Sequence, residues 1–136
     1  LVYAADKAQH VEEVILPALT RGEVVVCDRY VDSMIAYQGA GRVLDLVEVE
    51  QVARWATGGL RPDLTVLLDI DPAEALVHIR QQDRLEAAGL DFHRRAREHF
   101  LRLAGEDPGR YLVLGARESR ESIAERVAEK VFALLG

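Results

Sequence analysis

The chain has 136 residues, of which 49% are hydrophobic and 29% are charged, so its length suits one domain with a substantial apolar core. Its formal net charge of −6 argues against a nucleic-acid-binding protein that depends on neutralising phosphates, although a local basic site for a nucleotide is compatible with it. No apolar run approaches the roughly 20 residues that span a membrane, and the single cysteine, Cys27, precludes an intramolecular disulfide and indicates a reducing compartment such as the cytoplasm.

Helical and strand patterns alternate along the first half of the chain. Apolar residues at helical spacing predict a helix over residues 2–19, with Pro17 in its last turn, where it ends or bends the helix. A short run rich in β-branched residues predicts the first strand over residues 23–28, buried on both faces of a parallel sheet. Further helices are expected over residues 33–38 and 45–56.

The same alternation continues in the second half. A buried strand is expected over residues 64–69, followed by a helix that runs to about residue 82. Asp71 is its predicted N-cap, and Glu74 closes a capping box. The remaining elements are a helix over residues 90–103, a strand over residues 111–114 and a helix that begins at its N-cap, Ser119, and runs to residue 135. Three strands and about six helices in this order predict an α/β fold with a parallel sheet.

The strand predicted over residues 23–28 ends in two charged side chains, Asp28 and Arg29. In open α/β sheets, ligands bind outside the carboxyl ends of the strands. The planar guanidinium of Arg29 suits a phosphate, and the carboxylate of Asp28 suits Mg²⁺. The alternative is a structural Asp–Arg ion pair that joins the strand to the next helix.

Five segments follow in order along the chain: Tyr3-Ala4-Ala5-Asp6-Lys7-Ala8-Gln9-His10, Asp28-Arg29-Tyr30 with Ser33, Ala36-Tyr37-Gln38-Gly39 with Gly41-Arg42, Arg61-Pro62-Asp63-Leu64, and Asp83-Arg84-Leu85-Glu86. Together they resemble bacterial thymidylate kinase, in a match that is collinear from residue 1 to residue 136. The resemblance implies transfer of the γ-phosphoryl group of ATP to dTMP, giving dTDP, with Mg²⁺ held near Asp28. It also implies a cytoplasmic homodimer.

The resemblance implies an acceptor site for dTMP in the first third of the chain. Tyr3 matches an aromatic ring that stacks on thymine, and Lys7 stands where the family has an Arg that bonds to a base carbonyl. Arg29 matches the residue that binds the dTMP phosphate. Tyr37 matches a residue that packs against the sugar, and Gln38 suits the imide edge of thymine. The alternative for the first pair is an ordinary amphipathic helix, with Tyr3 half-buried and Lys7 in water.

A second group of residues matches the ATP side of the family's site. Arg80 and Arg84 lie in a segment, about residues 80–89, that matches a lid whose Arg residues close over the ATP phosphates. Ala116 and Arg117 match the loop that touches the adenine side of ATP. The alternative for the first two is a solvated, charged helix end.

The phosphate-binding loop of P-loop kinases, Gly-x-x-x-x-Gly-Lys-Ser/Thr, occurs nowhere in the sequence. The resemblance implies a P-loop nucleoside monophosphate kinase-like parallel sheet of five strands with flanking helices, in which the central strand leads into that loop. The missing loop, the missing central strand and an initial Leu in place of Met together indicate the carboxyl-terminal two-thirds of such an enzyme. We therefore expect an incomplete sheet with unpaired strand edges and no kinase activity from the chain alone.

Two other functions stay open. Lys7 replaces an Arg of the family, and Met34 stands where a polar side chain often touches the base, so a P-loop kinase for another nucleoside or nucleotide is one alternative. The second alternative is a non-catalytic remnant that binds or dimerises through the apolar faces of the helices over residues 2–19 and 45–56.

Two further charged groups are interpreted as structural. The basic run over residues 93–97 is balanced by Asp91 and Glu98, which is typical of a solvated helix face rather than an RNA-binding patch. Asp69 and Asp71 resemble paired carboxylates, but helix capping explains Asp71 better.

Overall fold

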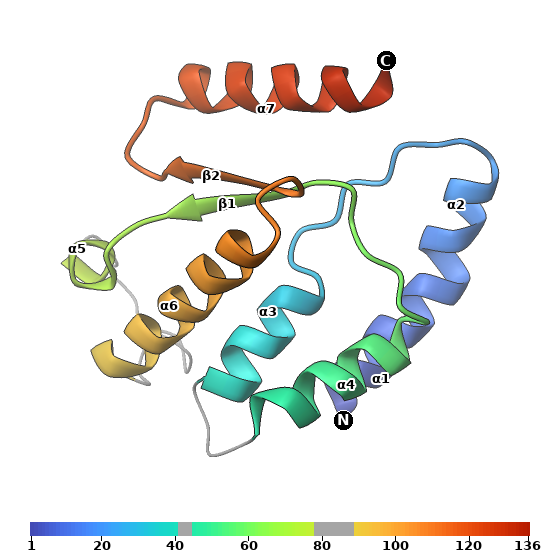
Figure 1. The fold of residues 1–136 in the computed structure, drawn as a ribbon, viewed down its shortest axis with the longest axis horizontal. Helices are drawn as coiled ribbons and strands as arrows, with labels where there is room; N and C mark the ends of the chain where they lie inside the picture. The colour runs from blue at the N-terminus through green and yellow to red at the C-terminus, as the bar shows by residue number, and fades with distance from the viewer. Residues whose placement is uncertain (41–44, 78–88) are drawn as a thin grey trace. The chain divides into compact units, whose positions relative to one another are not determined.

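The computed structural model describes residues 1–40, 45–77 and 89–136. The chain divides into two compact units, Leu1–Arg61 and Pro62–Gly136 (Figure 1). The first unit is helical, and the second unit combines helices with a small sheet. The expectation of a single domain over residues 1–136 stays a prediction. No helix in the described ranges combines the length and the apolar composition needed to cross a membrane.

The first unit opens with one long helical stretch that contains three labelled elements: α1 (Val2–His10), η1 (Val11–Ile15) and α2 (Leu16–Thr20). The middle element is a π-helix, in which the backbone N–H of Leu16 donates to the carbonyl of Val11. Pro17 follows immediately. A proline in a regular α-helix has no N–H to donate, and its ring collides with the carbonyl four residues earlier. The wider π segment supplies the extra room, so the helix passes Pro17 and ends at Thr20.

Two further helical stretches complete the first unit: α3 (Val31–Ile35), which continues into the π-helix η2 (Ala36–Ala40), and α4 (Leu46–Ala56). The side chain of Asp45 caps α4 by accepting from the backbone N–H groups of Val47 and Glu48. The helices α1, α3 and α4 pack against one another. Their buried core consists largely of small and β-branched side chains: Ala4, Val11, Ile15, Ala18, Ile35, Ala36 and Ala53. Small side chains allow the helix backbones to approach closely.

The prediction of a buried strand over residues 23–28 is wrong. These residues form no strand, and Val24 and Val26 are 61% and 92% exposed. A parallel strand becomes buried only when neighbouring strands pair with it and helices cover its faces. In the part of the chain that the structure describes, no strand pairs with this segment. The apolar residues therefore lie in an extended loop that leads to Asp28 and Arg29.

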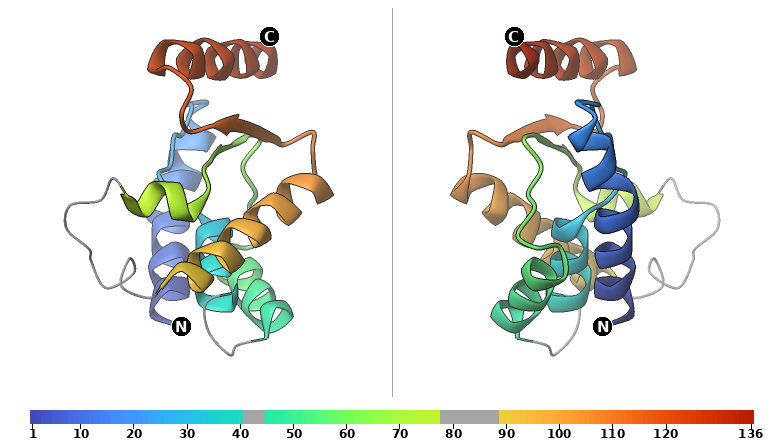
Figure 2. Two further views of the ribbon diagram at one scale, coloured as in Figure 1. Left: turned by 90° about the vertical axis from the view of Figure 1, so that its left-hand side faces the viewer. Right: turned by 90° about the vertical axis from the view of Figure 1, so that its right-hand side faces the viewer.

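The second unit is built on two parallel strands, β1 (Thr65–Asp69) and β2 (Tyr111–Gly115). Thr65 pairs with Tyr111 at one end, and Asp69 pairs with Gly115 at the other. Two helices lie on opposite faces of this pair in all three views, α6 (Leu90–Glu106) and α7 (Arg120–Leu135) (Figures 1 and 2). The prediction of these two strands and two helices is confirmed, with boundaries shifted by one to three residues.

Short polar side chains begin two helices of this unit, as the sequence predicts. Asp71 accepts from the backbone N–H of Ala73 at 2.8 Å and so caps α5 (Pro72–Val77). Ser119 accepts from the backbone N–H of Ser122 at 3.1 Å and caps α7. The predicted continuation of α5 to residue 82 lies outside the described residues.

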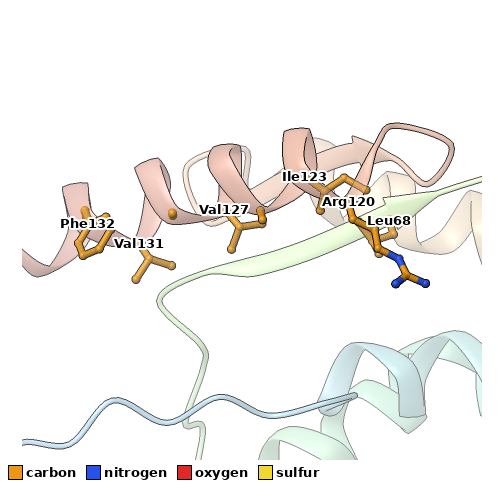
Figure 3. A pocket seen from close by; sticks show the side chains of 8 residues that line it. Leu68, Arg120, Ile123, Val127, Val131 and Phe132 are labelled. Atoms are coloured by element: carbon orange, nitrogen blue, oxygen red, sulfur yellow. The ribbon is translucent and has the colours of Figure 1, made fainter.

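An open apolar groove runs along α7 (Figure 3). Leu68 of β1 and Arg120 at the start of α7 lie at one end of the labelled row, and Phe132 lies at the other. Phe132 is 71% exposed and Leu68 is 50% exposed. Among the described residues, β1 pairs with β2 alone, which leaves its second edge without a strand. This open edge agrees with the expected incomplete sheet.

Candidate active site

Arg29 has an unusual backbone conformation. Its φ is 61°, and it is the one residue other than glycine, within the described ranges, with a positive φ. A left-handed conformation costs a residue with a Cβ about 1–2 kcal/mol, so it persists where the surrounding structure imposes it. The Arg29 guanidinium carbon lies 5.6 Å from the centre of the Tyr37 ring, which is a cation–π distance. The structure thus brings together two residues that the sequence analysis assigns to the acceptor site.

Tyr30, the residue after Arg29, links this turn to the segment that follows α4. The Tyr30 hydroxyl donates to the backbone carbonyl of Leu60 at 3.2 Å. Burial raises the pKa of the Tyr30 hydroxyl, so it stays protonated and available as a donor at neutral pH. Tyr30 is also the N-cap residue of α3. The turn therefore has supports on both sides, and Arg29 lies between the extended loop and the helix.

Asp28 is exposed beside Arg29. The expected alternative, an Asp–Arg ion pair at this point, is absent from the ion pairs of the described residues. In the same ranges, no group of three or more His, Cys, Asp or Glu side chains is arranged to hold a metal ion. Mg²⁺ usually retains several waters and binds one or two carboxylates together with substrate phosphates. A single accessible carboxylate is compatible with that mode of binding.

Tyr3 and Lys7 lie four residues apart on α1, so they share one face of the helix. Tyr3 is 59% exposed, whereas the side chain of Lys7 is 20% exposed and its ammonium lies 3.4 Å from Asp6. An ordinary amphipathic helix would show the reverse, with the ring covered and the ammonium in water. Gln38, on η2, is half-buried one residue after Tyr37. The exposed ring of Tyr3 is available for stacking on a ligand.

On the ATP side, the structure describes two of the four predicted residues. The backbone N–H of Ala116 donates to the carbonyl of Asp69 at 2.8 Å. Arg117 is exposed, with its Nε 3.9 Å from the carboxylate of Glu74. The other predicted residues, Arg80 and Arg84, lie outside the described residues, as does the predicted lid before Gly89. Gly41 and Arg42, from the segment that follows Gln38, also lie outside them.

The prediction of a solvated helix face over residues 93–97 is wrong for Arg97, which is only partly exposed. Its Nε lies 2.7 Å from Oδ1 of Asp69, and its Nη2 lies 2.9 Å from Oδ2, which is a bidentate pair. Its Nη1 lies 3.4 Å from the Asp71 carboxylate. The Arg97 side chain is 34% exposed, so it does not belong to a solvated face. That description fits Arg94, which is more exposed and lies 3.6 Å from Asp91 on its own helix.

The Arg97 pair changes the acidity of both partners. Hydrogen bonds from the Arg97 guanidinium lower the pKa of the Asp69 carboxyl below its ordinary value, against the opposing effect of burial. The Asp69 carboxylate in turn raises the pKa of Arg97. Both groups therefore carry full charge at neutral pH. Spacing in the sequence does not reveal this pair, since 28 residues separate its members.

A second charged cluster holds the loop between β2 and α7. The Glu118 carboxylate accepts from the backbone N–H of Gly115 at 2.9 Å and from the Ser122 hydroxyl at 3.2 Å. Nη1 of Arg126 lies 3.2 Å from both Glu118 oxygens. The bond from Gly115, helped by Arg126 and Ser122, lowers the pKa of Glu118. Ala116 and Arg117 lie in the loop that this cluster closes.

The sequence model of the family described as thymidylate kinase matches residues 1–127. The chain belongs to the thymidylate kinase family. It is 64% identical over 135 residues to a thymidylate kinase from Cutibacterium acnes, an alignment that covers 99% of this chain and 66% of that protein. It is 53% identical over 139 residues to a thymidylate kinase from Clavibacter michiganensis, with the same coverage. A thymidylate kinase from Deinococcus radiodurans is 52% identical over 130 residues, 93% of this chain and 63% of that protein.

The chain spans about two thirds of the length of these thymidylate kinases. The family match includes the Asp28-Arg29-Tyr30 turn and the loop with Ala116 and Arg117. The resemblance to thymidylate kinases in the sequence analysis is therefore confirmed at the level of the family. The roles of the individual residues stay predictions.

Proposed function

We propose that the full-length protein transfers the γ-phosphoryl group of ATP to dTMP, giving dTDP, and that this chain carries the dTMP site. Membership of the thymidylate kinase family supports this reaction. One structural observation carries the assignment of the site. Arg29 is held in a left-handed conformation with its guanidinium against Tyr37, and it takes part in no ion pair among the described residues. A positioned guanidinium that is available in this way suits a phosphate.

The proposed roles follow the chemistry of each side chain. Phosphoryl transfer asks the protein for little covalent chemistry, because positioning and charge stabilisation supply most of the rate. Arg29 binds the acceptor phosphate, and Tyr37 packs against the sugar. Tyr3 stacks on the base, while Lys7 and Gln38 bond to its edge. Lys7 offers a point charge without the planar fork of an Arg, so its contact with the base is weaker than the contact that an Arg would make.

The ATP side completes the proposal. Ala116 and Arg117 contact the adenine side, and Arg80 and Arg84 bind the phosphates of ATP from the lid. We propose a P-loop nucleoside monophosphate kinase sheet whose phosphate loop and central strand come from residues outside this sequence. The greater length of the relatives and the open edge of β1 support this arrangement.

A magnesium ion belongs to the proposed reaction, with Asp28 as the residue that would hold it. When bound, Mg²⁺ neutralises charge on the transferring phosphates. Asp28 adds one carboxylate oxygen close to the phosphate that Arg29 binds. The exposed position of this carboxylate leaves space for the waters that Mg²⁺ retains.

The proposed enzyme is a cytoplasmic homodimer. The helical stretches over residues 2–19 and 45–56 supply the apolar faces for the dimer. Val47 and Trp55 on α4 support this, since they are 61% and 84% exposed. The single cysteine, Cys27, is exposed and unpaired with another cysteine, which suits a reducing compartment.

A coupled assay of ADP release tests the proposed function. The full-length protein should release ADP from ATP and Mg²⁺ when dTMP is present, with a lower KM for dTMP than for dUMP or dCMP. Residues 1–136 alone should give no turnover, because nothing in this sequence matches the loop that holds the β- and γ-phosphates. Preference for another acceptor would assign a different nucleotide kinase. Absence of both turnover and nucleotide binding in calorimetry would leave a non-catalytic remnant.

A further inference from the structure

We propose that Arg97 is a positioning residue for ATP: through Asp69 it fixes the loop that carries Ala116 and Arg117. This inference rests on the proposed function, since it assigns a task to a residue on the ATP side of the same site. Arg97 itself touches neither of these two residues by any contact that the described part of the chain shows. Its effect is transmitted by Asp69.

Asp69 makes two bonds with two different parts of the unit. Its carboxylate forms the bidentate pair with Arg97 of α6, at 2.7 and 2.9 Å. Its backbone carbonyl accepts from the N–H of Ala116 at 2.8 Å. Asp69 is the last residue of β1, and its pairing with Gly115 is the last of the ladder, so the bond from Ala116 is the first one in the loop that follows β2. Arg97 therefore holds the side chain of the residue whose carbonyl binds the first residue of the loop, at the point where the ladder ends.

The same guanidinium also reaches the start of α5. Its Nη1 lies 3.4 Å from Oδ2 of Asp71, whose Oδ1 caps α5 through Ala73. Further along α5, the Glu74 carboxylate lies 3.9 Å from Nε of Arg117. The loop thus has two links to the elements that Arg97 holds, one through the backbone and one through side chains. Both links are on the loop residues assigned to the adenine side of ATP.

Loss of the Arg97 charge leaves the Asp69 and Asp71 carboxylates close together without a shared cation. Like charges at such a distance repel, so the end of β1 and the start of α5 would separate and the loop would follow. Two neighbouring groups, Glu74 and Arg117, face this cluster from α5 and from the loop itself. The residues assigned to dTMP belong to the other compact unit and are built on different helices. The expected change is therefore in ATP binding, with dTMP binding unaffected.

Steady-state kinetics of the full-length protein test this inference. Arg97→Gln should raise the KM for ATP about fivefold or more and leave the KM for dTMP within about twofold. Arg97→Lys restores a cation without the bidentate fork, so its KM for ATP should lie between those of Arg97→Gln and wild type. The matched control is Arg94→Gln, which removes a guanidinium from the same helix; among the described residues, the ion pair of Arg94 is with Asp91. Its two KM values should equal those of wild type.

A double variant separates a positioning role from a general loss of stability. Asp69→Asn with Arg97→Gln should raise the KM for ATP no more than Arg97→Gln alone, because both changes break one pair. A wild-type protein without dTMP-dependent turnover would sink the proposed function. An active wild-type protein whose Arg97→Gln variant keeps its KM for ATP would overturn the inference alone. A variant that only loses kcat, or in which both KM values rise equally, would overturn it as well, since general unfolding gives that pattern.

Discussion

The two compact units use their charged side chains differently. In Leu1–Arg61, each ion pair of the described residues joins side chains at most four residues apart, such as Arg21 with Glu23. In Pro62–Gly136, Arg97 joins α6 to the end of β1, 28 residues away. The short-range pairs each lie within one helix or turn, whereas the long-range pair fixes the relative positions of separate elements.

This difference concerns the charged side chains that each unit leaves available for an anionic ligand. In the second unit, Arg97 and Arg126 have carboxylate partners, and the loop that we propose for ATP is positioned by those pairs. In the first unit, Arg29 contacts the face of Tyr37 and no carboxylate among the described residues, and Asp28 is exposed. A ligand phosphate would be the first full anionic partner of Arg29. The first unit is therefore the place where side-chain changes should affect activity without loss of stability.

The largest expected effect follows from removing the Arg29 side chain. In the full-length protein, Arg29→Ala should lower kcat/KM for dTMP about 100-fold or more, because a charge-assisted, bidentate phosphate contact is lost. The ADP-release assay with varied dTMP measures this change. The KM for ATP should stay within about twofold of wild type.

Arg21→Gln is the matched control for this variant. Arg21 belongs to the same unit, and its exposed guanidinium pairs with Glu23, with Nε 2.6 Å from Oε1. It should retain the wild-type kcat/KM for dTMP. If Arg29→Ala kept more than about a tenth of the wild-type value, the phosphate would have another principal partner.

The backbone of Arg29 gives a smaller effect that concerns stability. Because φ is 61° at this position, Arg29→Gly should have a free energy of unfolding about 1 kcal/mol higher than Arg29→Ala. Both variants lack the contact with Tyr37, so their difference isolates the cost of a Cβ in the left-handed region. Urea unfolding followed by circular dichroism measures it. Equal stability of the two variants would show that position 29 stores no backbone strain.

The parts of the fold that the sequence predicts depend on local signals. Asp71 and Ser119 begin helices because each side chain reaches a backbone N–H two or three residues later, and the structure confirms both caps. The apolar run over residues 23–28 has the composition of a strand, but strand formation also requires a partner. No partner among the described residues supplies those hydrogen bonds, so the composition misleads there.

In the site, too, the sequence predicts features that depend on neighbouring residues and misses contacts between residues far apart in the chain. The family pattern identifies Arg29 and Tyr37 separately, and the structure brings them together across eight residues of turn and helix. Arg97 lies in a basic run that Asp91 and Glu98 balance in the sequence, yet its partner is Asp69 in another element. Glu118 likewise carries no motif, and its bonds to Gly115 and Arg126 become visible only in three dimensions.

The smallest expected effect is the dependence of stability on pH through Asp69. Its pKa is lower in the folded chain than the ordinary value of 3.8, so the pair stabilises the fold at every pH above that value. The contribution is lost as pH falls below about 4 and Asp69 becomes protonated in the folded state. Asp69→Asn should lower the free energy of unfolding by about 1 kcal/mol at pH 7, and the difference between wild type and variant should be smaller at pH 3 than at pH 7. Urea unfolding at the two pH values measures this, with Asp91→Asn as the control, since Asp91 lies 3.6 Å from Arg94 in full solvent.

A difference between wild type and Asp69→Asn that stays the same at both pH values would mean that the bidentate pair contributes shape and packing rather than charge. The contrast between the two units would then rest on geometry alone.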